Sequence, residues 1–248
     1  MLRATIPANV DRRAFTLIEM LVVISLITLL IALLLPSLGS SRWNAIKTRC
    51  GVQMRQIAVA ADSYSVENYG WFIPARVNQV QIAIDPPQQK EFDRFGYPKD
   101  HWRCPGRDYE PQIEPGFGNQ LVIGYQYYGG IKNWTNLAGT QVSKSPIRRE
   151  FAKSGWVIAA DTTIKVDGVW GGGRPEAFGD MPSHRRNNPW PVGGNQAFVD
   201  GSTRWVPFQE MYVLHSWSPT ARMCFIKQED LPAGLTLNLV TRATDHMQ

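Results

Sequence analysis

The sequence predicts an α+β protein in which a long N-terminal helix packs on a small antiparallel sheet with long loops. Two observations predict the helix: an uncharged apolar run at residues 20–35, and an amphipathic pattern that continues to Tyr64. A third predicts the sheet, because short β-prone runs alternate with Gly, Pro and Asn clusters downstream of residue 70. The 248 residues suffice for one ordinary domain and an appendage.

The composition is that of a folded, water-facing protein with one separate apolar element. Hydrophobic residues make up 44% and charged residues 19%, which excludes collagen-like and wholly disordered chains. Lys and Arg number 26 against 21 Asp and Glu, a net charge of +5. Because this excess is small and spread thinly, it forms no basic stripe, and we expect no nucleic-acid partner.

The apolar element is long enough to cross a membrane. The span 15–38 carries one charged residue, Glu19, and measures about 36 Å at about 1.5 Å per residue. Arg12 and Arg13 precede it. By the positive-inside rule, the first residues stay in the cytoplasm and the bulk of the chain is exported in a single pass, N-in and C-out.

Glu19 does not fit a plain anchor. An ionised carboxylate in a membrane helix costs about 2.5–3.5 kcal/mol on insertion scales, so it needs a partner or a task. No Lys or Arg is placed to pair with it within the same helix. The nearest cation would be the amine of a neighbouring subunit that has been cut between Ala14 and Phe15.

The segment from Arg12 to Glu19, followed by an apolar helix with Pro36, resembles the processing site of type IV prepilins and type II secretion pseudopilins. The resemblance implies that a prepilin peptidase cuts between Ala14 and Phe15 and methylates the Phe15 amine, and that Glu19 guides subunit register. The family usually has Gly before the cut, where this chain has Ala14. An unprocessed anchor beginning at Met1, or a signal-peptidase cut before Ser40, would be the alternatives.

The same resemblance implies a pilin-like lollipop held in the bacterial inner membrane. Its partners would be the peptidase/methyltransferase and other pilin or pseudopilin subunits, and it would be no enzyme. The alternative function is a membrane-anchored surface module that does not polymerise and binds glycans through its many aromatic residues. We expect a leader at 1–14, a transmembrane and assembly helix at 15–38, an amphipathic stem at 39–70 and a periplasmic or extracellular β-rich part at 71–248.

The stem is predicted from apolar residues at spacings of three and four, which fall on one face of a helix. They are Trp43, Ile46, Cys50, Met54, Ile57, Ala61 and Tyr64. The helix should end near Asn68 to Gly70, and Pro36 should bend it because its ring removes a hydrogen bond.

Beyond the stem, five apolar runs predict strands. They are residues 121–128, 156–160, 196–199, 203–206 and 211–217. The runs on either side of Asp200-Gly201 predict a hairpin, because Gly tolerates the positive φ of a tight turn. The stretches 77–94 and 168–191 are expected to be loops.

The globular part also resembles a branch of pilin-like proteins abundant in planctomycetes and verrucomicrobia. The branch carries a helix Cys, a Cys-Pro, a Gly-Tyr, and a late His followed by Asp-Gly. In this chain these would be Cys50, Cys104-Pro105, Gly124-Tyr125, His184 and Asp200-Gly201.

Three Cys in an exported chain allow one disulfide and leave one over. We favour Cys50 with Cys104, which would pin a loop to the stem. A bond that involves Cys224, and three reduced thiols, remain open alternatives. No pair has metal-ligand spacing.

Recognisable catalytic or cofactor motifs are not expected. The four His are scattered without a metal-binding spacing, Ser183 beside His184 is no nucleophile elbow, and the Gly-rich segment 171–174 lacks the Lys of a phosphate loop. Calcium is the one cofactor considered, because some pseudopilins hold it in a C-terminal loop through oxygen ligands. The candidate ligands are Asp161, Asp167, Asp180 and Asp200.

Overall fold

The computed structural model describes residues 15–107, 110–171, 178–231, 235 and 241–247. The chain divides into two compact units, Met1–Ala45 and Ile46–Gln248. The helix α1 (Leu17–Glu67) contributes its first part to one unit and its remainder to the other. The leader 1–14 expected from the sequence, including Ala14, lies outside the described residues.

The predicted long helix is confirmed and continues through Pro36 and Gly39. It ends where the sequence predicts, because the chain turns at Asn68 to Gly70. There the Gly70 amide donates to the Ser65 carbonyl over 2.8 Å. Tyr69 and Gly70 both have positive φ, a conformation that stops a helix and favours Gly at this place.

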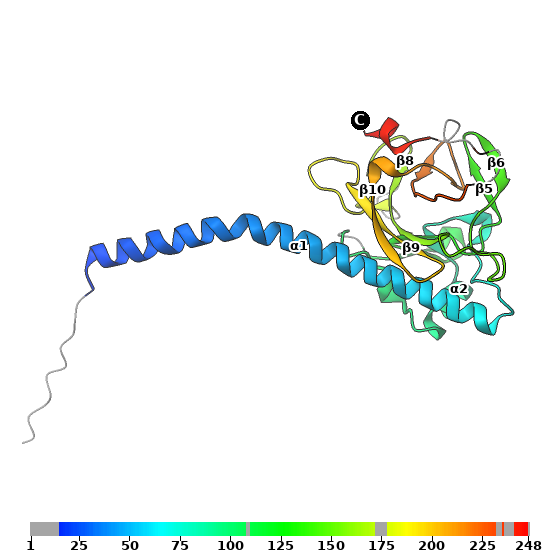
Figure 1. Ribbon diagram of the computed structural model, residues 1–248, viewed down its shortest axis with the longest axis horizontal. Helices are drawn as coiled ribbons and strands as arrows, with labels where there is room; N and C mark the ends of the chain where they lie inside the picture. Colours follow the sequence, from blue (N-terminus) through cyan, green and yellow to red (C-terminus); the bar gives the residue numbers. More distant parts are fainter. Residues whose placement is uncertain (1–14, 108–109, 172–177, 232–234, 236–240, 248) are drawn as a thin grey trace, which may run out of the picture. The chain divides into compact units, whose positions relative to one another are not determined.

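The remaining elements are short, and the predicted α+β class is confirmed (Figure 1). A second helix, α2, spans Pro86–Arg94, and 3₁₀ turns lie at Val77–Gln79, Lys99–Trp102, Pro115–Phe117, Phe208–Glu210 and Ala243–His246. The strands are β1 (Ala83–Ile84), β2 (Gln112–Glu114), β3 (Gln120–Val122), β4 (Tyr125–Tyr127), β5 (Asn133–Asn136), β6 (Gly139–Val142), β7 (Val157–Asp161), β8 (Ile164–Val166), β9 (Gly193–Phe198), β10 (Thr203–Pro207) and β11 (Arg222–Cys224).

All pairings between these strands are antiparallel. The largest sheet has the order β10-β9-β7-β4, a second has the order β1-β3-β2, and β5-β6 and β8-β11 form two-stranded pairs. The predicted hairpin is confirmed: β9 and β10 pair with Ala197 opposite Thr203, and Gly201 in the connecting turn has φ +76°. The hairpin fixes the edge of the largest sheet, and β7 lies beside it.

Two sequence predictions about this part are wrong. The stretch 77–94 was expected to be a loop, yet it contains α2, because Asp85 and Gln88 form a capping box and Pro86 occupies the first turn. The run 211–217 was expected to be a strand, but it makes isolated bridges through Tyr212 to Ile226 and Arg242. Met211, Val213 and Leu214 are buried by packing without a continuous ladder.

In the second unit, the predicted apolar face of α1 is buried. Cys50, Met54, Ile57 and Ala61 are fully enclosed, and Ile46 and Tyr64 are partly enclosed. They share a core with side chains of the largest sheet, including Tyr125, Ile158 and Ala197. Burying an apolar side chain of this size contributes about 1.5–3 kcal/mol, so this face is a major source of stability.

The aromatic residues mostly fill the interior. Tyr125, Tyr127 and Tyr128 are buried. The Phe92 ring meets the Trp102 and Tyr127 rings edge-on at centroid distances of 4.9 and 5.2 Å. Of the aromatics at the end of the stem, Phe72 is buried, whereas Tyr69 and Trp71 are exposed.

One buried histidine joins three distant segments. The Thr135 amide donates to Nδ1 of His215 over 3.0 Å, and Nε2 lies 2.9 Å from the Gln79 carbonyl. The Gln81 side chain donates to the His215 carbonyl over 2.9 Å. The Thr135 amide only donates, so Nδ1 carries no proton, and the Gln79 carbonyl only accepts, so Nε2 carries one. The His215 ring is therefore neutral. Burial lowers the pKa of His215 to about 4.

We predict that replacing Met54 by Ala destabilises the protein by about 2–5 kcal/mol, because a fully buried side chain leaves a cavity. The measurement is urea unfolding of the full chain in detergent, followed by Trp fluorescence. The control is Val59→Ala on the exposed face of the same helix, for which we expect a change within about 0.5 kcal/mol. Equal effects of the two changes would contradict the assignment of the buried face.

We also predict an acid-induced loss of stability from His215. The pKa of His215 is about 4 in the folded state, below the ordinary value near 6.5, so the unfolded chain takes up a proton first as pH falls. The stability that His215 contributes is therefore fully present above about pH 6.5 and is lost as the pH falls to about 4. At about 1.4 kcal/mol per tenfold difference in proton affinity, the loss is about 3 kcal/mol.

The measurement is the free energy of unfolding at a series of pH values from 7.5 to about 4.5, a window set by the shift described. The variant His215→Gln should be less stable at neutral pH and should lack this slope. A slope that persists in the variant would contradict the assignment to His215.

Candidate functional site

Among the described residues, we consider two candidate functional places: the start of α1 and a buried cluster in the second unit. At the start of α1, the Thr16 amide and hydroxyl donate to Glu19 Oε2 over 2.8 and 2.7 Å. In return, the Glu19 amide donates to the Thr16 hydroxyl over 3.3 Å. This is a capping box, which satisfies amides that the first turn leaves without helical partners.

The expectation from the sequence was that Glu19 needs a cation to pair with its carboxylate, and its capping role was not predicted. The pattern Thr-x-x-Glu directly before an apolar run is the sequence signature that predicts it. The box holds the carboxylate at the very beginning of the helix, next to Phe15. Glu19 thus has a local structural task whether or not it meets a second subunit.

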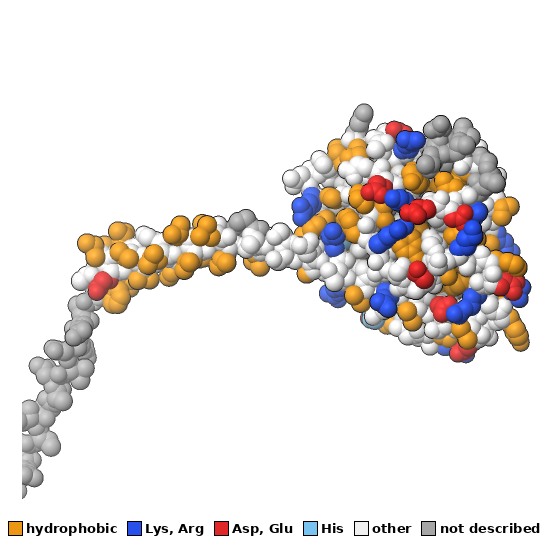
Figure 2. Space-filling model, in the orientation of Figure 1, with side chains coloured by type: hydrophobic (Ala, Val, Ile, Leu, Met, Phe, Trp, Pro, Cys, Tyr) orange, Lys and Arg blue, Asp and Glu red, His pale blue; other side chains and the backbone are white. Residues whose placement is uncertain are grey.

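The helix that follows carries apolar side chains over the face seen in Figure 2, and its consecutive large apolar residues are exposed. From Phe15 to Leu38 its large apolar residues are exposed, for example Leu17 at 85% and Leu33 at 68%. By length and composition α1 can cross a membrane. Such a surface needs lipid or other protein around it, because isolated water-exposed apolar patches of this extent are rare.

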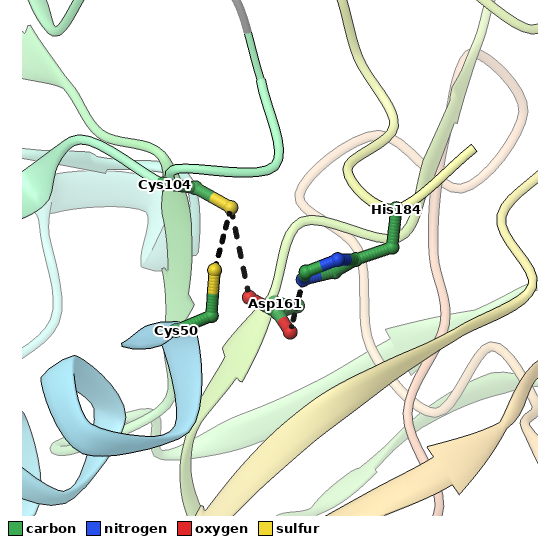
Figure 3. A group of neighbouring side chains, drawn as sticks. All are labelled: Cys50, Cys104, Asp161 and His184. Atoms are coloured by element: carbon green, nitrogen blue, oxygen red, sulfur yellow. Dashed lines mark hydrogen bonds and ion pairs between the residues drawn. The ribbon is translucent and has the colours of Figure 1, made fainter. Parts of the chain in front are cut away.

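The buried cluster consists of Cys50, Cys104, Asp161 and His184 (Figure 3). Cys50 lies on α1, Cys104 follows the 3₁₀ turn Lys99–Trp102, Asp161 is the last residue of β7, and His184 lies in the segment before β9. All four are buried. One donor atom from each lies within 4.8 Å of the others.

Asp161 is the centre of the hydrogen bonding in the cluster. Its Oδ2 accepts from the backbone amide and the side-chain amide of Asn195, over 2.7 and 2.9 Å, and lies 2.8 Å from His184 Nε2. Its Oδ1 faces Cys104 Sγ at 3.9 Å. The Asn195 side chain also donates to the Lys47 carbonyl over 3.0 Å, which ties this strand to α1.

The protonation state of each group in the cluster depends on its neighbours. Burial favours a neutral His184 ring, but the Asp161 charge and hydrogen bond outweigh it and raise the pKa of His184 to about 10. Burial also opposes ionisation of Cys104, yet the contacts with Cys50 and His184 lower the pKa of Cys104 to about 6. The hydrogen bond with Cys104, followed by burial, raises the pKa of Cys50 above its ordinary value.

The backbone around the cluster is closely packed. A Cβ atom on Gly106 would lie 3.0 Å from the ring atoms Cε1 and Nδ1 of His184 and 3.4 Å from Cys104 Sγ. The Gly106 amide donates to Cys104 Sγ over 3.4 Å. His184 itself has φ +59°, an uncommon conformation for a non-glycine residue that persists only where its surroundings demand it.

The two cysteines favoured as a pair do lie side by side. Their sulfur atoms are 3.3 Å apart and both are free thiols, as is the buried Cys224. A disulfide has a sulfur–sulfur distance of about 2.05 Å, so the structure holds the pair as neighbours without the bond. The disulfide between Cys50 and Cys104 stays a prediction for the oxidised protein.

The four Asp residues considered for calcium have four different sets of partners. Asp161 belongs to the buried cluster, Asp167 pairs with Arg222, and Asp180 pairs with Arg185. Asp200 accepts from the Ser202 amide over 2.8 Å in the β9–β10 turn. Calcium binding stays a prediction.

The late His and the Asp-Gly of the sequence resemblance have separate roles, because His184 joins the cluster and Asp200 shapes a turn. The convergence of His184 and Asp161 on the two cysteines was not predicted. The four positions are separated by about 20 to 60 residues, and such spacing forms no local motif. The sequence features that point toward this cluster are a Cys on the predicted buried face of the stem and an Asp at the end of a predicted apolar strand.

Comparison with known proteins gives two matches, and no solved structure matches the chain. Residues 10–35 match the prokaryotic N-terminal methylation motif. Over 140 residues, the chain is 27% identical to the type II secretion system core protein G of Klebsiella michiganensis. This alignment covers 50% of the chain and 94% of the relative.

We predict that Gly106→Ala disturbs the cluster and destabilises the protein by about 1–3 kcal/mol, because the added methyl group overpacks the site. The control is Gly155→Ala, where a Cβ atom would meet nothing within 4 Å; its effect should stay within about 0.5 kcal/mol. Both are measured by urea unfolding. If Gly106→Ala is as mild as the control, the close packing around His184 is wrong.

Proposed function

We propose that this chain is a pilin-like or pseudopilin subunit, a structural component of a filament. Its methylation motif and its similarity to a secretion core protein support the proposal. The filament would be that of a type II secretion system or a type IV pilus-like machine. The observation that carries the proposal is the apolar surface of α1 from Phe15 to Leu38, which is exposed on all sides and begins with a fixed carboxylate.

The proposed maturation follows from the motif. A prepilin peptidase cuts between Ala14 and Phe15, removes the leader 1–14 and methylates the new Phe15 amine. The span 15–38 then anchors the subunit in the bacterial inner membrane, N-in and C-out. The stem 39–70 and the part 71–248 lie on the periplasmic or extracellular side, and no catalytic step is assigned to them.

The proposed assembly step uses the Glu19 carboxylate and the Phe15 amine of a neighbouring subunit. The capping box supports this because it fixes the carboxylate at one height on the helix. Within a bundle of apolar helices the effective dielectric is low, so an unpaired charge costs more and a paired one gains more than in water. A subunit in the wrong register would leave both charges without partners.

The alternative is a membrane-anchored module that binds glycans and does not polymerise. The exposed Tyr69 and Trp71 at the end of the stem are the surface aromatics that favour it. Arg148 already lies over the Trp71 ring, at 5.6 Å from its centroid. We favour the filament subunit because the apolar helix surface extends over the whole span and the aromatic surface is small. Crosslinking between N-terminal helices in cells distinguishes the two.

We predict that Glu19→Gln abolishes incorporation into filaments while leaving cleavage intact. Gln at this position still accepts the Thr16 amide hydrogen bond of a capping box, so the variant removes the charge and keeps the cap. The measurements are the N-terminal sequence of the purified chain and the amount of chain in sheared filament fractions.

The matched control is Ser25→Ala on the same helix, which removes a hydroxyl that donates to the Leu21 carbonyl. This variant should assemble normally. Normal assembly of Glu19→Gln would refute the charge pairing. A wild-type chain that keeps residues 1–14 in its native host would refute the maturation and the filament role with it.

A further inference from the structure

We propose that Cys50, Cys104, Asp161 and His184 form a binding site for one zinc ion. Two sulfur atoms, one imidazole nitrogen and one carboxylate oxygen are the donor types that zinc takes in proteins, and four is its usual number of ligands. The four donor atoms lie within 4.8 Å of one another in a buried place. The site is independent of the assembly function proposed for α1.

The distances suit a tetrahedral ion after small side-chain movements. With bonds of about 2.3 Å to sulfur and about 2.0 Å to nitrogen or oxygen, ligand atoms around zinc are about 3.3–3.8 Å apart. The two sulfur atoms are 3.3 Å apart and Cys104 Sγ is 3.9 Å from Asp161 Oδ1. The His184 ring, now 2.8 Å from Asp161 Oδ2, has to exchange this contact for the metal.

The surroundings hold the ligands as a metal site requires. Asn195 donates twice to Asp161 Oδ2, which leaves Oδ1 directed at Cys104 as the ligand oxygen. The Gly106 amide donates to Cys104 Sγ, a contact that stabilises a thiolate. Such outer contacts fix the orientation of ligands and tune the affinity. The uncommon backbone of His184 is what aims its ring into the cluster.

Neither a disulfide nor a catalytic triad accounts for the whole cluster. A disulfide uses the two cysteines and gives no reason for a carboxylate and an imidazole beside them. A Cys–His–Asp nucleophile needs access for a substrate, whereas the side chains of His184 and Asp161 are 0% exposed and both cysteines are likewise buried. Zinc uses all four groups and needs no opening to solvent.

Zinc also fits the chemistry better than calcium. Calcium takes six to eight oxygen ligands, whereas this site offers one carboxylate and two thiols. Thiolates select softer ions such as zinc. Zinc binds both sulfurs as thiolates and the imidazole as the neutral ring, and the protons that these groups carry before binding are released to solvent. The bound ion would connect α1, the Cys104 segment, β7 and the His184 segment.

The first test is the metal content of the full chain, purified in detergent under reducing conditions without chelator. We expect about one zinc per chain by plasma mass spectrometry. Cys104→Ser should lower the zinc content to below about a tenth of that of the wild-type chain. Cys224→Ser, which changes a buried cysteine outside the cluster, should leave it unchanged.

A second measurement avoids variants that fail to fold. The wild-type chain is stripped of metal, kept reduced and titrated with Co²⁺ alone. We expect tetrahedral d–d bands and thiolate-to-cobalt charge transfer, which saturate at about one equivalent and disappear on addition of zinc.

Three results would overturn the proposal. They are a reduced wild-type chain that neither contains zinc nor gives cobalt–thiolate bands, full zinc retention in Cys104→Ser, and a native chain in which Cys50 and Cys104 are recovered as a disulfide-linked peptide pair. The last result would instead confirm the disulfide predicted from the sequence.

Discussion

Burial of one face of α1 against the four-stranded sheet is the constraint on which the second unit depends. It places Met54 and Ile57 in the main core, and it brings Cys50 to the end of β7, where Asp161 lies. The Asn195 side chain extends the same contact, because it bonds both to Asp161 and to the Lys47 carbonyl of the helix. The polar cluster therefore exists only because the apolar face is packed, and a weaker core would expose its charges to water.

The first part of α1 is different, since its apolar side chains are not covered by any residue that the structure describes. A single carboxylate interrupts them, and the structure gives it a local hydrogen-bonding task in the capping box with Thr16. This task and the proposed pairing with a neighbour's amine do not compete. The cap positions the carboxylate, and the charge that remains is what a second subunit would recognise. One residue thus serves both the start of the helix and the proposed register of assembly.

The buried cluster joins elements that are far apart along the chain, and its polar groups need one another. A carboxylate and an imidazole buried as an ion pair cost several kcal/mol in lost hydration, which only good geometry and further hydrogen bonds repay. Asn195 provides such bonds to Asp161, and the Gly106 amide donates to the neighbouring Cys104 Sγ. A zinc ion would satisfy the same groups more completely and would cross-link the segments that carry them. The site would then stabilise the globular unit and leave the membrane helix to assembly.

Local patterns in the sequence were enough to predict the apolar span, the stem face through Tyr64, its end near Gly70 and the hairpin at Asp200-Gly201. These follow from periodicity, hydropathy and the conformational freedom of glycine, which act between near neighbours. Prediction from the sequence failed at α2, where a capping box was overlooked, and at residues 211–217, where burial does not come from strand pairing. The contact of Asp161 and His184 with the two cysteines could be found only in the folded chain, because contacts between residues so far apart in sequence depend on how the sheet and the helix pack.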